Sequence, residues 1–239
     1  MINTLAQIDY VASAGGSPWH RASALPKLAL ATLAIVLAVF APGLRLQLAL
    51  YAVGWLLALS SRLPLRLLAT AAGYPLLFAV LYLALRWDGS WLHALSIALR
   101  PLTGSLYAVW LVGTTPYPDL FAPLSRVLPR AAGDGLFLTY RAVFELIVRA
   151  QRLFRAFRLR AAESLPARRR LPLAGEGLAT LVLYGFERSQ RMYATMLLRG
   201  HSGRICGCRH WAEATRADLW VALAAGAIVA AGALLWGMR

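Results

Sequence analysis

Apolar residues form long runs in the first half of the chain and again near its end. The runs cover residues 28–41, 46–59, 67–85, 92–112 and 219–236. A helix needs about 20 apolar residues to cross the hydrocarbon core of a bilayer. The last three runs approach this length, while the first two are short and fit either two short spans or a hairpin. We favour two spans, so the pattern predicts an all-α integral membrane protein with about five transmembrane helices.

Two prolines and one arginine interrupt these runs. Pro75 predicts a kink in the third run, and Arg100-Pro101 predicts a break in the fourth. An arginine inside a span costs about 2.5–3.5 kcal/mol, so Arg100 is expected to face other helices or a polar cavity. The last run has small residues at every fourth position, a spacing that allows close helix packing: Ala222, Gly226 and Ala230.

The segment between the fourth and fifth runs is amphipathic and basic. Apolar residues at helical spacing predict a short helix over residues 119–128 and two long helices over 132–161 and 173–200. Leu165-Pro166 and Arg168-Arg169-Arg170 are expected to separate the long helices. The first 25 residues are polar and are expected to form a loop. We therefore divide the chain into an N-terminal membrane domain with four spans, a domain of amphipathic helices and a C-terminal transmembrane helix, at residues 1–116, 117–215 and 216–239.

The two long helices contain a repeat with an offset of 39 residues. Residues 143–161 and 182–200 agree at six of nineteen positions: Val143/Val182, Arg149/Arg188, Gln151/Gln190, Arg152/Arg191, Leu159/Leu198 and Arg160/Arg199. Each copy has a seam of side chains at steps of four, three, four and three residues, which lie on one stripe of a helix: Val143, Ile147, Ala150, Phe154 and Phe157, against Val182, Phe186, Ser189, Tyr193 and Met196. Each copy ends on an arginine followed by a small residue. This suggests that the two helices bind a partner through a pair of similar contacts. The alternative is that they are two helices of one bundle whose arginines are solvated.

Composition and charge agree with a membrane protein. The chain is 59% hydrophobic and 15% charged, whereas ordinary soluble domains are about half apolar and about a quarter charged. From Arg126 to Arg216 there are 17 arginines and 6 acidic residues, so this segment carries +11 of the net charge of +15. Basic residues between spans mark the cytoplasmic side. We therefore expect a multi-pass protein with its N-terminus inside and its C-terminus outside, surrounded by lipid and without a nucleic-acid partner.

Few residues point to catalysis. The acidic residues of the basic segment are scattered, and neither a Gly-rich phosphate loop after a strand nor a Gly-x-Ser-x-Gly elbow occurs. We expect no enzyme activity, no cofactor and no ATP bound by the chain itself. Glu145 and Glu187 are expected to form local salt bridges of little energetic value. Two imidazoles and two thiols are a suitable ligand set for zinc, but their close spacing favours a structural or incidental role over a metal site: His201, Cys206, Cys208 and His210.

Taken together, these motifs resemble the transmembrane T component of energy-coupling-factor (ECF) transporters, and most closely its cobalt-type member, CbiQ. The family signature is Ala-Arg-Gly at the ends of two helices. Here Leu159-Arg160-Ala161 and Leu198-Arg199-Gly200 keep the arginine and lack the leading alanine. The resemblance covers nearly the whole chain and includes Ser17–Arg21 and Pro26–Leu28 (although Ala24-Leu25-Pro26 replaces the usual Asp-Pro-Arg), Thr114–Pro116, Pro129 and Tyr140-Arg141.

The resemblance implies a scaffold in an ABC importer of a bacterial or archaeal inner membrane. Such a subunit holds a membrane substrate-binding subunit and a dimer of cytoplasmic ABC ATPases, and the assembly can include a small accessory membrane subunit. The two long helices would be coupling helices, with Arg160 and Arg199 each entering a groove of one ATPase. Their neighbours Leu159, Ala161, Leu198 and Gly200 would lie beside the contact. ATP would be bound by the ATPases, and the implied cargo, Co2+ for cobalamin biosynthesis, by the substrate-binding subunit.

Other functions stay open from the residues alone. The chain could be the T component of an importer for nickel or for a vitamin, because the coupling device is shared. A membrane-embedded transferase could use the arginines to hold a phosphate headgroup, although no acidic metal-binding motif accompanies them. A membrane assembly factor could bind a partner without moving cargo.

Overall fold

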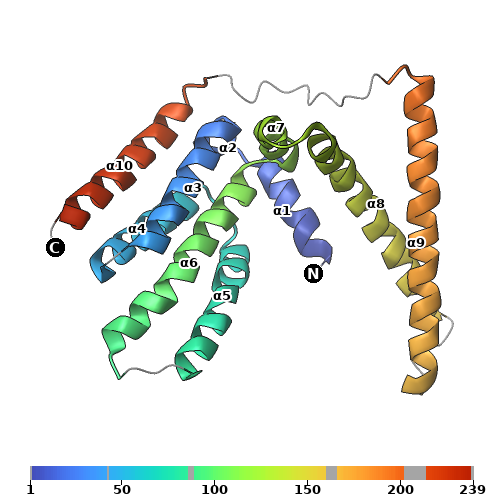
Figure 1. Cartoon of the computed structure of the whole chain (residues 1–239), viewed down its shortest axis with the longest axis horizontal. Coiled ribbons are helices and arrows are strands. Elements are labelled where there is room, and N and C mark those ends of the chain that lie inside the picture. The colour runs from blue at the N-terminus through green and yellow to red at the C-terminus, as the bar shows by residue number, and fades with distance from the viewer. Residues whose placement is uncertain (1, 42, 86–88, 160–165, 202–213, 238–239) are drawn as a thin grey trace. The chain divides into compact units, whose positions relative to one another are not determined.

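The computed structural model describes residues 2–41, 43–85, 89–159, 166–201 and 214–237. In these residues it consists of α-helices joined by short turns, and no strand occurs. This agrees with the predicted all-α class. The helices, labelled in Figure 1, are α1 (Ile2–Ala14), α2 (Pro18–Arg21), α3 (Ala24–Phe40), α4 (Leu44–Ser60), α5 (Leu65–Leu85), α6 (Trp91–Thr114), α7 (Tyr117–Val127), α8 (Arg130–Leu159), α9 (Ala167–Leu198) and α10 (Asp218–Gly237).

All eight predicted helices are present as α3 to α10, although α9 begins six residues earlier than predicted. Pro166 has an extended backbone and caps the helix, and Pro172 lies inside it. Because Pro172 is only in the second turn, its missing N–H removes one hydrogen bond near the helix start, where the helix tolerates it. Pro166 therefore lies before α9, as predicted, but the placement of Arg168-Arg169-Arg170 between the helices is wrong, since these residues belong to the first turn of α9.

The prediction of an N-terminal loop is also wrong. Residues 2–14 form α1, and α1 packs against α6. One side of this helix is apolar and carries Ile8, Val11 and Ala12. Ala12 is buried, and Val11 packs against the core. Because polar residues lie among these apolar ones, the sequence pattern did not indicate this short helix.

Two helices are long and apolar enough to cross a membrane, at Leu68–Leu85 and Trp91–Thr114. Three further apolar helices are shorter, at Ala24–Phe40, Leu44–Ser60 and Asp218–Leu234. Length and composition thus support a helical membrane protein. The count of five spans stays a prediction.

The chain divides into two compact units, Met1–Pro123 with Cys208–Arg239, and Leu124–Gly207. In the first unit α6 packs against α1, α3, α4 and α5, while α10 packs on α3 and α4. Tyr107 and Trp110 of α6 are buried: the Tyr107 hydroxyl donates to the Leu50 carbonyl at 3.0 Å, and Trp110 Nε1 donates to Ser61 Oγ at 2.8 Å. Large aromatic side chains with satisfied polar atoms make α6 the centre of this unit.

Neighbouring segments make hydrogen bonds to the helices whose apolar runs the prolines and Arg100 interrupt. Both α5 and α6 continue through Pro75 and Pro101, so the predicted break in the fourth run is wrong. Ser105 Oγ of α6 donates to the Ala72 carbonyl of α5 at 2.8 Å, one residue after Ala71, whose carbonyl loses its helical N–H donor at Pro75. Arg100 Nη2 donates to the Ala41 carbonyl just beyond α3 at 3.2 Å, so Arg100 reaches another helix, as predicted.

Among the residues that the structure describes, the small-residue stripe of α10 lies on an exposed side of the helix. Ala222, Gly226 and Ala230 are exposed, and the space beside Gly226 is open. The buried side chains of α10 are Val221 and Ile228, and these belong to the core. Close packing through this stripe stays a prediction, because within the described residues α10 packs through the larger apolar side chains of its other face.

Polar groups join three helix ends in the first unit. Lys27 is only 1% exposed, and its Nζ donates to the Thr114 carbonyl at the end of α6 at 3.1 Å. The Asp218 carboxylate at the start of α10 accepts from the Ser23 N–H at 2.7 Å, the Ser23 hydroxyl at 2.9 Å and the Thr215 N–H at 2.8 Å. These contacts tie the starts of α3 and α10 together and hold α3 against the exit of α6.

Candidate functional site

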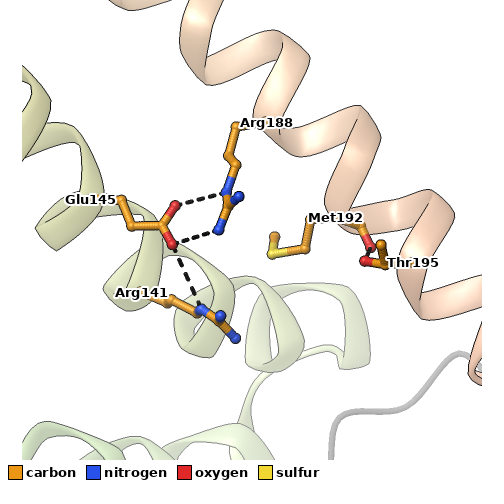
Figure 2. Close-up of polar contacts among 5 residues, drawn as sticks. All are labelled: Arg141, Glu145, Arg188, Met192 and Thr195. Carbon is orange, nitrogen blue, oxygen red and sulfur yellow. Dashed lines mark hydrogen bonds and ion pairs between the residues drawn. The ribbon is translucent and has the colours of Figure 1, made fainter.

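The helices that carry the repeat, α8 and α9, pack against each other and form most of the second unit. Arg188 of α9 donates to the Glu145 carboxylate of α8 twice, from Nε to Oε2 at 2.9 Å and from Nη2 to Oε1 at 2.8 Å. Figure 2 shows this pair together with Arg141, whose Nε lies 4.0 Å from the same Oε1 that accepts from Arg188 Nη2. The hydrogen bonds and the negative charge of Glu145 raise the pKa of Arg188. Glu145 therefore joins two helices, which exceeds the local role predicted from the sequence.

Glu187 has the predicted local role. Its carboxylate lies 3.7 Å from Arg191, one turn further along the same helix. Both side chains are more than half exposed, so the pair contributes little to stability.

The contacts between α8 and α9 show that the two helices run antiparallel. Position 145 of α8 meets 188 of α9, and the Arg149 guanidinium lies 4.7 Å from the centre of the Tyr184 ring. Further along α8, Phe157 packs against Gly177, where a Cβ atom would lie 2.8 Å from the ring. A glycine at 177 therefore permits this close approach.

The repeat makes the helix pair a local two-fold arrangement. Shifting a residue by 39 positions exchanges Arg149 with Arg188 and Glu145 with Tyr184, so the two contacts between the helices are equivalents. Leu146 and Gly185, which are also equivalent, lie against each other: a Cβ atom on Gly185 would be 3.8 Å from Leu146 Cδ2. The axis of this two-fold therefore passes between Leu146 and Gly185.

The helix pair has two different grooves on its opposite sides. The apolar groove is lined by the seam residues and their neighbours: Val143, Leu146, Ile147, Ala150, Leu178, Leu181, Val182 and Gly185. The cationic groove is lined by Phe144, Glu145, Val148, Arg149, Arg152, Tyr184 and Arg188. The seam of α9 lies open beyond the groove, since Val182 is 70% and Phe186 64% exposed. Apolar side chains at such exposure indicate a surface that another molecule covers.

The leucines that begin the two predicted arginine motifs lie at opposite ends of this pair. Leu159 and Leu198, the last residues of α8 and α9, are each 13 residues from the axis positions, or about 20 Å along each helix. Both are extremely exposed, at 89% and 88%. Arg160 and Ala161 lie outside the described residues.

The exit of α9 has a defined shape. Gly200 has a φ of 73°, its N–H donates to the Leu197 carbonyl at 3.0 Å, and the His201 N–H donates to the Met196 carbonyl at 3.0 Å. These two bonds form a Schellman motif, which ends a helix on a residue in the left-handed region. Arg199 is the exposed C-cap residue of this motif. Gly200 therefore serves the helix end, while Arg199 is presented to the surroundings.

The structure describes only one of the four residues that the sequence offered as possible metal ligands. His201 closes the Schellman motif, whereas Cys206, Cys208 and His210 lie outside the described residues. Tyr184 was not predicted as a contact residue, because its equivalent in the repeat is a glutamate and the two copies therefore differ at this position. Its position one turn before Arg188 could have indicated a contact across the pair.

Comparison with known proteins identifies the family of the chain. No curated protein matches the chain. A family model described as "Cobalt transport protein", CbiQ, matches residues 15–207, which includes α8, α9 and the exit of α9. The chain therefore belongs to the CbiQ family of cobalt transport proteins and is a membrane protein.

Proposed function

We propose that this protein is the transmembrane scaffold and energy-coupling subunit of an ECF-type ABC importer for cobalt ions. It transmits the motion of a cytoplasmic ABC ATPase dimer to a separate membrane subunit that binds the substrate. ATP binds to the ATPases and the cargo to the substrate-binding subunit, so the chain itself performs no catalysis.

The observation that carries the proposal is the two-fold relation of α8 and α9. An ATPase dimer presents two equivalent grooves related by a two-fold axis, and a heterologous single chain can match it only by repeating its contact. The exits at Leu159 and Leu198 are equivalent, lie at opposite ends of the pair and are exposed. Arginine suits such a contact because its guanidinium makes several directed hydrogen bonds to carboxylates or carbonyl oxygens.

The apolar groove supports the other half of the coupling. It lies across the two-fold axis and is lined by both helices. A partner seated there would contact α8 and α9 at once, so a change in the angle between them would move it. We assign this groove to the substrate-binding subunit, whose membrane helices would offer a matching apolar surface.

The decisive experiment replaces both exit arginines. Arg160→Ala with Arg199→Ala should leave the protein in the membrane but lower copurification of the ATPases at least about tenfold, since each arginine supplies charge-assisted hydrogen bonds. Each single variant should fall between the double variant and the unchanged protein. Arg155→Ala with Arg191→Ala removes the same charge elsewhere on α8 and α9 and is the control. Full ATPase binding and full Co2+ uptake in the double exit variant would refute the proposal.

Cargo is tested separately, in cells that carry the complete importer. We expect accumulation of radiolabelled Co2+ that depends on this chain. Accumulation of Ni2+ or a vitamin instead would keep the coupling role and change the substrate.

A further inference from the structure

The proposed coupling function leaves the cationic groove without an assigned role. We propose that it binds the phosphate headgroup of an anionic phospholipid from the membrane in which the chain lies. The proposal depends on the charge and shape of this groove and not on the ATPase partner.

Charge is unbalanced within the groove. Its lining holds three guanidinium groups and a single carboxylate. Glu145 is engaged by Arg188 through two hydrogen bonds, so the positive charge of Arg149 and Arg152 is not matched by a carboxylate among the lining residues. Guanidinium groups bind phosphate oxygens in a fork geometry, which favours a phosphate as the occupant.

Two of the three guanidinium groups are held in place before a ligand arrives. Arg188 is fixed by Glu145, and Arg149 lies over the Tyr184 ring at 4.7 Å. They come from different helices and are equivalent positions of the repeat. A bound phosphate between them would therefore bridge α8 and α9 across the two-fold axis, and it would lose little affinity to side-chain ordering.

The remaining walls favour a lipid over a soluble anion. Phe144 and Val148 line the groove beside the arginines, and Val148 is exposed. These side chains offer an apolar surface to the glycerol and upper acyl region of a lipid. The chain leaves the candidate span α6 at Thr114 and enters the apolar helix α10 at Asp218, so the segment between them is tethered to the bilayer at both ends, where headgroups are abundant.

The test measures lipid retention by the purified full-length chain. The protein in dodecyl maltoside is given equal amounts of phosphatidylglycerol and phosphatidylcholine, and bound lipid is identified by native mass spectrometry. We expect preferential retention of phosphatidylglycerol. Arg149→Gln with Arg152→Gln should lower it at least about fivefold, because a basic residue near an anionic headgroup contributes about that factor.

The control removes the same number of positive charges from α8 and α9 outside the groove. Arg155→Gln with Arg191→Gln should keep retention within about twofold of the unchanged protein, since exposed charges beyond contact range are screened. Arg152→Gln alone keeps both contacts between α8 and α9 and should still lower retention. This variant separates loss of the site from loosening of the helix pair.

Several results would overturn the proposal. Equal retention of the two lipids, or an equal loss in the control pair, would mean only diffuse attraction. Displacement of phosphatidylglycerol by millimolar inorganic phosphate would mean a site for soluble anions. Loss of ATPase binding in the groove variant with unchanged lipid retention would mean a protein-binding surface.

Discussion

Lys27 shows how one side chain can join several helix ends. A lysine at the start of an apolar helix usually extends its ammonium group toward the membrane surface. Here the side chain is buried, donates to the Thr114 carbonyl, and lies near the carboxylates of Asp119 and Asp218. Its charge is compensated because the starts of α3, α7 and α10 meet the end of α6 at this point.

Replacement of Lys27 should therefore destabilise the first unit. Lys27→Met would leave the Thr114 carbonyl with one donor fewer and would remove the positive charge that faces two aspartates. We expect the thermal unfolding midpoint in detergent, followed by circular dichroism, to fall by about 3–6 °C. Arg21→Met, in the exposed part of the same basic flank, should change it little. An unchanged or higher midpoint for Lys27→Met would show that packing outweighs the charge.

His20 predicts a dependence of stability on pH. Burial lowers its pKa below the usual value of 6.5, and the positive charge of Lys27 lowers it further. The unfolded chain then binds a proton at a higher pH than the folded chain, so this contribution to stability is complete above about pH 6.5 and decreases as the pH falls toward the folded pKa. The unfolding midpoint of the unchanged protein should drop more between about pH 7.5 and 5.5 than that of His20→Gln. Equal drops would contradict the assignment.

At the scale of elements, α8 and α9 are held together by unlike contacts at equivalent positions. One side of the two-fold axis has an ion pair, and the other has an arginine over a ring. The interface also contains apolar and glycine contacts, such as Phe157 against Gly177. We therefore expect the ion pair to set the register of the helices, while apolar burial adds to their attraction.

Disulfide formation at the axis tests this register. With Cys206 and Cys208 changed to serine, Leu146→Cys and Gly185→Cys should form a disulfide, because these positions face each other. Glu145→Gln should slow its formation, and Glu145→Arg with Arg188→Glu should restore it. Glu187→Gln, which removes the intrahelical pair with Arg191, is the control and should have no effect. A rate indifferent to position 145 would mean that the ion pair does not set the register.

At the scale of the whole molecule, the basic segment decides which ends of the helices face the cytoplasm. Because the segment from Arg126 to Arg216 carries +11 of the net charge of +15, we propose that its helices α8 and α9 lie inside the cell and that the loop before α6 lies outside. With the native cysteines removed, Ser90→Cys should react with a membrane-impermeant maleimide on intact cells. Ser189→Cys should react only after permeabilisation. Labelling of both on intact cells would reject the proposed topology and the five-span count with it.

The local parts of this protein were open to prediction from the chain. Apolar runs located α3 to α6 and α10 because burial in lipid or in a core demands contiguous apolar residues. The repeat located α8, α9 and both arginine motifs because equivalent contacts require equivalent residues. Position-specific features such as Gly200 were also accessible, since a helix that ends in the left-handed region needs a residue without a Cβ atom.

Tertiary structure decided which residues meet. The sequence contained Glu145, Arg188, Arg149 and Tyr184, but only the antiparallel register pairs them across the helices and creates an apolar groove on one side and a cationic groove on the other. It also decided that α10 packs through Val221 and Ile228 instead of its small-residue stripe. These outcomes depend on competition between alternative buried faces, and the face that buries more apolar surface with satisfied polar groups is favoured.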